Sequence, residues 1–165
     1  MATVTNRRTA VLTLPTDTQF KVVRVFNAPR RLVYRAWTTP ELVKRWWHAN
    51  RGEVILAEVD LRLGGKWRWV MVTPDGLEVA FHGVYHEIVP NERLVYTEAF
   101  EGVPNADESA TLNTLTLVEK DGRTTATMLT EAHSREVRDL ILSTGMEDGL
   151  QKALDLLEEV AVSLL

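Results

Sequence analysis

The sequence lacks cysteine altogether. This absence excludes disulfide bonds, thiolate metal sites and a cysteine nucleophile. An excess of positive charge is also missing, because 19 lysines and arginines stand against 23 aspartates and glutamates and leave a formal charge of −4. That balance argues against a general surface for nucleic acid or for an anionic membrane. The sequence therefore predicts no nucleic-acid partner and no membrane association.

Long apolar runs are absent too. No stretch approaches the roughly 18 consecutive apolar residues that a membrane-spanning helix requires. Residues 1–8 are polar and contain no apolar segment, so no signal peptide is visible. We therefore expect a soluble cytoplasmic protein.

The composition is that of an ordinary globular protein. Of the 165 residues, 45% are hydrophobic and 25% are charged, which is enough apolar material for a real core. The length suits one domain, and the chain shows no internal repeat, low-complexity run or linker. We predict a single domain over residues 1–165, in which residues 1–8 form a loose tail.

The last stretch, residues 134–165, has the pattern of a long helix. Ser134 is a good N-cap, and Glu136 places a negative charge in the first turn. Apolar residues then recur with a 3.6-residue period and no proline interrupts them. We predict one continuous amphipathic helix, roughly 45–48 Å long. Gly145 and Gly149 within it indicate tight packing, a bend, or one wall of an internal cavity.

The rest of the chain reads mostly as strands joined by short turns. Two short helices, beginning near Pro29 and Pro40, follow the first long strand. Short turns between consecutive strands indicate an antiparallel sheet. We predict an α+β fold in which a curved antiparallel sheet wraps around the final helix. The expected strands are residues 10–14, 20–26, 54–61, 66–72, 77–89, 93–100, 111–120 and 123–131.

Several motifs, in a fixed order from about residue 20 to residue 157, resemble one protein family. They are Val25-Phe26-Asn27-Ala28-Pro29, the segments 36–42 and 45–47, Gly64-Gly65-x-Trp67, Pro74-Asp75-Gly76, the segment 83–94, and Gly145-Met146 with Gly149. In these residues the chain resembles the activator-of-heat-shock-protein-90-ATPase homologue family. The resemblance implies the START-like (SRPBCC) helix-grip fold of the birch-pollen allergen, which often holds a hydrophobic ligand between helix and sheet.

Two positions depart from the family pattern. After Trp46-Trp47 the family commonly has Gly-Pro, whereas this chain has His48-Ala49. After Gly149 the family commonly has tryptophan, and the smaller Leu150 would enlarge a cavity. In the eukaryotic co-chaperone, a separate N-terminal domain binds the chaperone. The family name alone therefore does not make this protein a chaperone activator.

An apolar set on the predicted inner face is the candidate ligand site. Alternation places aromatic and aliphatic side chains on one face of the sheet, opposite the helix. A concave and mostly apolar surface with a few polar tips is typical of a small-molecule pocket. The same set also describes a filled core, and both interpretations stay open. The candidates are Trp67, Trp69, Met71, Phe81, Tyr85, Tyr96, Leu115, Met128, Met146 and Leu150.

Signals for catalysis and for metals are weak. No Gly-x-Ser-x-Gly elbow and no phosphate loop occur. His82 and His86 lie four apart on one strand, which is too far for both to bind one zinc ion. We predict no metal and no cofactor. Glu98 would act as a general acid or base if it faced inward beside Tyr96, because desolvation would raise its pKa. The pattern favours an outward-facing or loop-paired glutamate instead. His86 or Glu87 would serve only if a bulge turned one of them inward.

Three functions follow as hypotheses. The first is binding of a small hydrophobic molecule without catalysis. The second, which rests on family analogy alone, is a partner role such as modulation of a chaperone ATPase. The third is an enzyme of the cyclase or hydrolase type acting on a polyketide-like compound, as in other branches of the superfamily. A homodimer through a sheet edge or the short helices is also plausible.

Overall fold

A computed structural model describes residues 9–165, and the tail predicted at residues 1–8 lies outside these described residues. Within them the chain forms one antiparallel sheet of eight strands, in the spatial order β1-β2-β8-β7-β6-β5-β4-β3. The prediction of an antiparallel sheet is therefore confirmed. The strands are β1 Val11–Thr13, β2 Gln19–Phe26, β3 Glu53–Val59, β4 Lys66–Val72, β5 Glu78–Val89, β6 Arg93–Phe100, β7 Thr111–Lys120 and β8 Arg123–Glu131.

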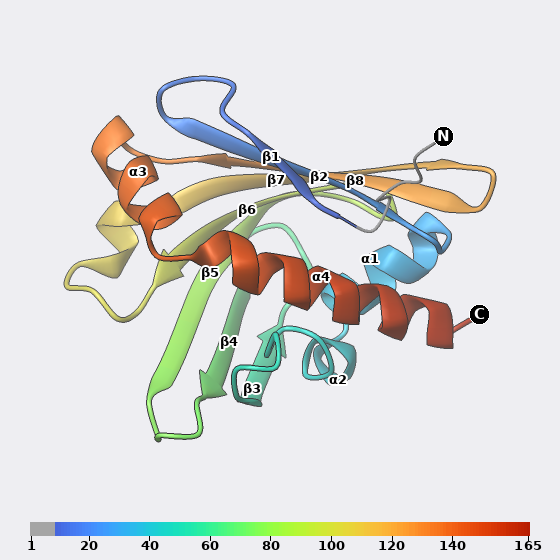
Figure 1. Cartoon of the computed structure of the whole chain (residues 1–165), viewed down its shortest axis with the longest axis horizontal. Coiled ribbons are helices and arrows are strands. Elements are labelled where there is room, and N and C mark those ends of the chain that lie inside the picture. The colour runs from blue at the N-terminus through green and yellow to red at the C-terminus, as the bar shows by residue number, and fades with distance from the viewer. Residues whose placement is uncertain (1–8) are drawn as a thin grey trace.

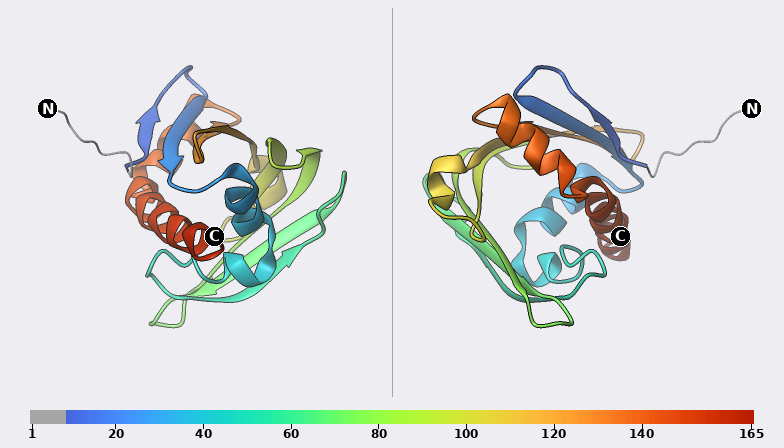
Figure 2. Two further views of the ribbon diagram at one scale, coloured as in Figure 1. Left: turned by 90° about the vertical axis from the view of Figure 1, so that its right-hand side faces the viewer. Right: turned by 60° about the vertical axis from the view of Figure 1, so that its left-hand side comes forward.

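The sheet curls around the helices, so the predicted α+β arrangement is also confirmed (Figures 1 and 2). Two helices, α1 Arg30–Thr38 and α2 Pro40–Val43, follow β2, and a 3₁₀ turn, η1 Ala106–Ser109, follows β6. The C-terminal part contains α3 Arg135–Ser143 and α4 Met146–Ser163. Helix α4 crosses the open side of the curled sheet, with α1 packed beside it. None of the helices in residues 9–165 is both long and apolar enough to cross a bilayer.

Residue alternation fixes which side chains face the helices. Along β2, every second residue from Phe20 to Phe26 is buried. The same period places Leu115 and Leu117 of β7 in the core. Because successive side chains in a strand point to opposite faces, these buried positions define the inner face of the whole sheet. Helix α1 covers one end of this face with the buried residues Leu32, Val33 and Trp37.

One prediction about the C-terminal stretch is wrong. Residues 134–165 are not one helix, because α3 ends at Ser143 and α4 begins at Met146. Between them Gly145 adopts φ +77°, a left-handed conformation that glycine enters without the penalty a side chain incurs. Apolar periodicity continues through this break, so the pattern did not reveal it. The expected N-cap is present, since the Ser134 side chain accepts a hydrogen bond from the Val137 N–H at 3.1 Å.

A second glycine reflects close packing. A Cβ atom on Gly149 would lie 2.8 Å from the guanidinium of Arg51. The loop after α2 therefore lies directly against the first turns of α4. Arg51 also forms a 3.9 Å ion pair with Asp148. The two glycines thus have different roles: one ends a helix and the other lets a loop approach.

A buried arginine ties α4 to the sheet. The side chain of Arg24 lies on the inner face of β2, 1% exposed, with its guanidinium 5.2 Å from the centre of the Phe26 ring. It donates to Asp155 at 2.7 Å and to Glu158 at 3.4 Å. Glu158 also accepts the backbone N–H of Asn27 at 2.8 Å. These contacts fix the C-terminal half of α4 over β2, at the end of the sheet where α1 also packs.

Candidate functional site

Four neighbouring aromatic residues occupy the inner face of β4, β5 and β6. Trp67 pairs with Gly83, Trp69 pairs with Phe81, and Tyr85 pairs with Tyr96. Trp67 and Trp69 lie with their ring centres 5.2 Å apart, and Trp67 meets Tyr96 edge to face at 5.9 Å. Such tilted and edge-to-face contacts are favourable beyond the area they bury. The result is a rigid aromatic surface on the inner side of the sheet.

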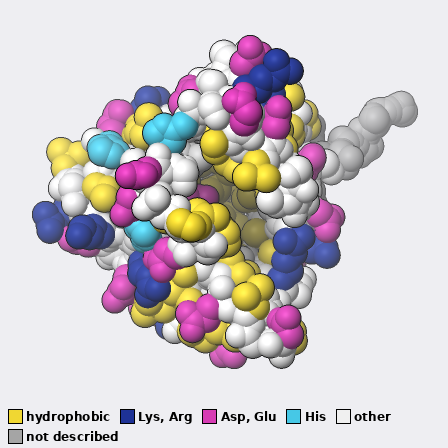
Figure 3. Space-filling view, turned by 90° about the vertical axis from the view of Figure 1, so that its left-hand side faces the viewer, with side chains coloured by type: hydrophobic (Ala, Val, Ile, Leu, Met, Phe, Trp, Pro, Cys, Tyr) yellow, Lys and Arg dark blue, Asp and Glu magenta, His cyan; other side chains and the backbone are white. Residues whose placement is uncertain are grey.

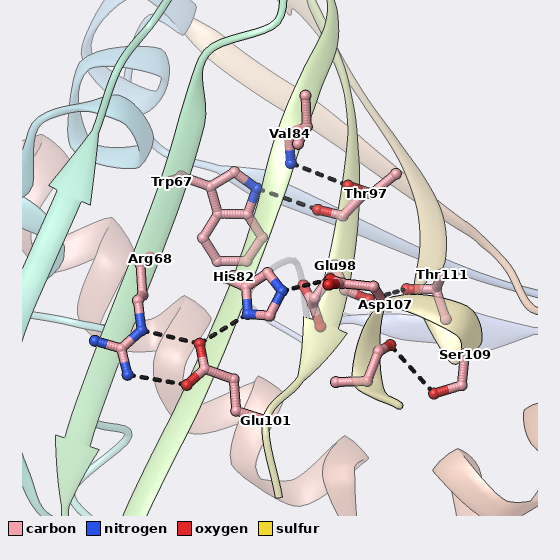
Figure 4. A network of polar contacts seen from close by, with 11 residues as sticks. Trp67, Arg68, His82, Val84, Thr97, Glu98, Glu101, Asp107, Ser109 and Thr111 are labelled. Carbon is pink, nitrogen blue, oxygen red and sulfur yellow. Dashed lines mark hydrogen bonds and ion pairs between the residues drawn. The ribbon is translucent and has the colours of Figure 1, made fainter. Parts of the chain in front are cut away.

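Gly83 makes room for this surface. A Cβ atom there would lie 2.6 Å from Nε1 of Trp67 and would also clash with the Thr97 carbonyl. The Trp67 N–H instead donates a 3.1 Å hydrogen bond to that carbonyl (Figure 4). A glycine at this position of the strand therefore reflects the close approach of an indole ring.

A small, partly open cavity of about 30 Å³ lies against this aromatic surface. That volume exceeds the space one water molecule needs and is far below the several hundred Å³ of a pocket for a drug-sized molecule. The cavity thus accommodates one small chemical group. Its lining residues are Trp37, Trp67, Trp69, Tyr85, Leu94, Tyr96 and Glu98.

Glu98 is the ionisable carboxyl group in this lining. It is partly buried on the inner face of β6, where it shares the face with Tyr96 and pairs across to Thr111 of β7. Desolvation raises the pKa of Glu98 to about 7 and also raises the pKa values of Tyr85 and Tyr96. Among residues 9–165, no hydrogen bond or ion pair reaches the Glu98 carboxyl group. At neutral pH this group therefore exchanges readily between its acid and its carboxylate form.

A second polar group beside the cavity also lacks a partner. The Nε1 atom of Trp69 is buried and, within the described residues, has no hydrogen-bond partner. Buried polar groups in proteins are nearly always hydrogen-bonded, and an exception calls for an explanation. Trp69 and Glu98 both line the cavity, so two unpaired polar groups converge on one small space.

A strip of hydrogen-bonded side chains continues from Glu98 across the sheet. Thr111, Asn113 and Thr130 are buried on the inner faces of β7 and β8. Asn113 donates to the Thr111 hydroxyl at 3.0 Å and accepts from the Thr130 hydroxyl at 2.7 Å. The Thr111 hydroxyl in turn donates to the Glu98 carbonyl oxygen at 3.4 Å (Figure 4). This strip makes one side of the inner face polar, opposite the aromatic surface.

The inner face is accessible from one end of the molecule. Figure 3 shows a hollow in the face that carries α3 and the loop after β6, with apolar side chains around and inside it. Residues that pack on the core from this part of α3 and α4, Ile141, Leu142, Met146 and Leu150, are all only partly buried. We call this hollow, together with the small cavity, the cleft.

The ten predicted site residues fall into two groups. Trp67, Trp69, Tyr85 and Tyr96 line the cavity together. The other six lie on the inner face or on α4 but not in the cavity lining. Phe81 packs on Trp47 and Phe100, and Met71 lies near Gly52. Leu115 is fully buried in the core, whereas Met128, Met146 and Leu150 are partly buried and pack against it.

Trp37 and Leu94 also line the cavity, although the sequence did not mark them as site residues. Trp37 belongs to the buried, apolar face of α1. Leu94 alternates with Tyr96 and Glu98 along β6, so the two-residue period could have found it. No local signal placed the first helix over the cavity, because that contact depends on the tertiary fold.

The outer face of the same strands carries a separate charged network (Figure 4). Arg68 donates to both oxygens of Glu101 at 2.9 Å, and His82 lies between Glu101 at 2.7 Å and Asp107 at 2.5 Å. The hydrogen bonds from Arg68 and, to a smaller extent, from His82 lower the pKa of Glu101 to about 2. The hydrogen bond to Asp107 raises the pKa of His82 above its ordinary value. The network fastens the loop after β6 to β4 and β5.

Neither of the other acid–base candidates turns into the cleft. The register of β5 shifts between Tyr85 and Glu87, so a bulge is present at His86. His86 is nevertheless exposed, and Glu87 forms a 3.2 Å ion pair with Arg93. In residues 9–165, no group of three or more histidine and carboxylate side chains is placed to hold a metal ion.

A larger groove of about 510 Å³ runs beside the C-terminal half of α4. Three carboxylates and no aromatic ring line it, so it lacks the features of an apolar ligand site. Its lining residues are Thr9, Asn27, Asp155, Glu158, Glu159 and Val162.

Comparison with known proteins agrees with the fold described above. Residues 27–161 match the family described as activator of Hsp90 ATPase homolog 1-like protein. The chain belongs to this family. No curated protein sequence matches the chain. The segment that matches the family, residues 27–161, includes every residue that lines the cavity.

Solved structures of bacterial proteins share the whole fold. A Rhodobacter sphaeroides protein is 24% identical, with 94% of this chain and 99% of that chain covered and a TM-score of 0.84. A Nitrosomonas europaea protein is 25% identical over 89% of this chain and 96% of its own, with a TM-score of 0.78. An Arthrobacter aurescens protein is 23% identical, with 93% and 91% covered and a TM-score of 0.82. These likenesses show that the helix-grip-like arrangement extends over nearly the complete chain.

Proposed function

We propose that this member of the family binds a small, largely apolar molecule in the cleft between the sheet and helices α3 and α4. The observation that carries the proposal is the aromatic surface of Trp67, Trp69, Tyr85 and Tyr96 around the small cavity. Large amphipathic rings suit such a site, because each offers apolar area and a polar tip. The partly buried apolar side chains of α3 and α4 extend this surface toward solvent.

The cavity and the hollow have different parts in this proposal. The cavity of about 30 Å³ is large enough for one polar head group of the ligand. The apolar body would lie in the hollow, against Met146 and Leu150, whose side chains are only partly buried. Binding would remove this apolar surface from water, which is favourable by roughly 25 cal/mol per Å² before the entropy of association is subtracted.

A thermal-shift screen tests the proposal with sterols, flavonoids, fatty acids and aliphatic alcohols. We expect at least one compound to raise the melting temperature in a concentration-dependent way, because a ligand that binds only the folded state stabilises it. The dissociation constant of each stabilising compound is then measured by titration calorimetry. A screen in which no compound shifts the melting temperature contradicts the proposal.

A matched pair of variants locates the site. Leu150→Trp places a large ring in the cleft, whereas Leu140→Trp makes the same change at a residue that is 66% exposed on α3. We expect the first variant to weaken binding at least tenfold and the second to leave the dissociation constant unchanged. Equal affinity in both variants would show that the ligand binds elsewhere.

The enzyme hypothesis is favoured by one specific observation. Glu98 faces the cavity with a pKa of about 7, which suits a group that donates and accepts protons near neutral pH. Compounds found by the screen are therefore incubated with the wild type and with Glu98→Gln and followed by NMR. Turnover by the wild type that the variant lacks would establish catalysis, and unchanged compounds in both would rule against it for those compounds.

The partner hypothesis and the homodimer stay predictions. An exposed apolar patch at Trp46 and Trp47 would favour a partner role, but these two residues do not form one. Trp46 is only 3% exposed and packs against Trp37 and Trp69, and Trp47 packs against Trp69 and Phe81. The pair therefore packs on Trp69 and buttresses the aromatic surface.

A further inference from the structure

The unpaired carboxyl group in the aromatic cavity indicates what kind of head group the site accepts. We propose that the ligand carries a protonated amine, which lies in the cavity against the carboxylate of Glu98. This inference rests on the proposed function and adds a chemical class to it. An alkylammonium or arylmethylammonium group on an apolar body has the required chemistry.

The first argument is the missing counter-charge. In residues 9–165 no cation pairs with Glu98, whose pKa is raised by desolvation alone. Arg68 comes from β4 but points to the outer face, where both of its hydrogen bonds go to Glu101. An unpaired carboxylate in a desolvated site is unfavourable, and a ligand that brings its own positive charge removes this penalty.

Within residues 9–165, the elements around Glu98 present no charge that competes with a ligand cation. On the same face, β5 and β6 present Tyr85 and Tyr96, and α1 presents Tyr34; all three have raised pKa values, mainly because of desolvation, and are neutral at pH 7. β7 contributes the uncharged Thr111 and Asn113.

The charged groups of the C-terminal helices are engaged elsewhere. Arg138 of α3 is buried and donates to the Thr16 carbonyl at 2.7 Å and to Asp139 at 2.8 Å. Arg51, which lies against α4, forms an ion pair with Asp148. Neither guanidinium is available to neutralise Glu98.

The second argument is the aromatic surroundings. Trp37, Trp67 and Trp69 share the cavity lining with Glu98 and with the two tyrosines. A cation near the face of an indole or phenol ring is stabilised by about 0.5–2 kcal/mol, and more when water is excluded. Rings and carboxylate together thus favour a cation over a neutral polar group, while a carboxylate or phosphate head group would be repelled by Glu98.

The third argument is size. About 30 Å³ of space admits a primary ammonium group but not an aromatic ring. The charged end of the ligand would therefore enter the cavity, and the apolar remainder would point toward the hollow.

Two matched probes test the inference, 2-naphthylmethylamine and the neutral 2-naphthylmethanol. Both are titrated calorimetrically into the full-length protein at pH 6 and at pH 8, where the amine stays protonated. We expect the amine to bind at least tenfold more tightly than the alcohol at pH 8. Its affinity should rise about tenfold from pH 6 to pH 8, because the carboxylate fraction of Glu98 rises from about 9% to about 91% around a pKa of about 7. The affinity of the alcohol should not rise.

The substitution Glu98→Gln should abolish the preference for the amine and the dependence on pH, while the alcohol still binds. Glu53→Gln, at an exposed position of β3, is the matched control and should behave like the wild type. If Glu98→Gln does not fold, a measurement on the wild-type protein alone still tests the inference. In two buffers of different ionisation enthalpy at pH 7, amine binding should release about half a proton, because about half of the Glu98 groups are protonated at that pH.

The outcomes separate the two proposals. If the alcohol binds and the amine shows neither preference nor proton release, the amine inference fails and the apolar binding site stands. If neither probe binds and the general screen also finds no ligand, both fail. Unchanged amine affinity in Glu98→Gln would likewise overturn the inference.

Discussion

The two ends of the inner sheet face differ in how completely they are filled. At the end covered by α1 and the C-terminal half of α4, Phe26, Leu117 and Leu157 are almost completely buried. At the other end, beside α3, the apolar residues Met128, Met146 and Leu150 remain partly exposed. The strip of hydrogen-bonded polar side chains takes the place of aliphatic side chains on the inner face there. The closed end thus holds the fold together, whereas the open end is filled less completely.

The position of the helices explains this division. The contacts of Arg24 with Asp155 and Glu158 hold α4 against β2 at the closed end. At the open end the break at Gly145 separates α3 from α4, so no continuous helix covers the inner face there. Stability and access are therefore assigned to different halves of the same helix-grip arrangement.

The largest expected effect tests whether the closed end is the stability core. Leu157→Ala should destabilise the protein by about 2–5 kcal/mol, because it leaves a cavity among fully buried neighbours. The same change at Leu150, in the open end, should cost less than about 2 kcal/mol, because this side chain is only partly buried. Urea unfolding of both variants measures the difference. Equal losses of unfolding free energy in the two variants would show that the two ends contribute equally to stability.

The second prediction concerns the pH dependence that Glu98 gives the open end. The folded pKa of about 7 lies above the ordinary value of 4.5, so the folded state binds this proton more tightly than the unfolded state. The associated stability is fully present below pH 4.5 and is lost as the pH rises through about 7, at most about 3 kcal/mol. Glu98→Gln should lose less stability than the wild type between pH 5 and pH 7.5. If the free energies of unfolding of the two proteins changed in parallel over this pH range, the Glu98 carboxyl group would be solvated in the folded state.

The third prediction uses the two glycines at the junction of the ends. Gly145→Ala should destabilise the protein by about 1–2 kcal/mol, because alanine at φ +77° is strained. At Gly149 the added methyl group meets only the flexible end of Arg51, and alanine favours the helix by about 1 kcal/mol, so the two effects nearly cancel. Thermal unfolding distinguishes them. If Gly145→Ala were neutral, the break between α3 and α4 would not depend on glycine.

The smallest effect is expected for the outer network. His82→Gln should cost less than about 1 kcal/mol, because His82 and its partners are partly exposed to solvent. The pKa of His82 is raised in the folded state, so its contribution is complete below pH 6.5 and fades as the pH rises above that value. Hydrogen exchange in residues 101–109 should quicken at pH 6 in the variant. Unchanged exchange would mean that the network does not fasten this loop.

Much of the sheet could be predicted from the sequence, because alternation and turn residues are local signals. The bounds of β4, β6, β7 and β8 agree with the predicted ranges. The break in the C-terminal helix could not be predicted in this way, since the apolar period continues on both sides of Gly145. The sequence favoured an outward-facing or loop-paired Glu98, and this expectation is wrong, because Glu98 lines the cavity. Alternation shows that Tyr96 and Glu98 share a face, but only the tertiary fold decides which face is inside.

The place of β2 in the sheet has a consequence for synthesis of the chain. This strand pairs with β8, which belongs to the other end of the sequence, along its whole length. A nascent chain therefore emerges from the ribosome with Phe20, Val22 and Phe26 on a strand whose long partner has not yet been translated. Non-local pairing of this kind is slow and leaves apolar surface open to aggregation. The protein completes its fold only when the last strand and helix have left the ribosomal tunnel.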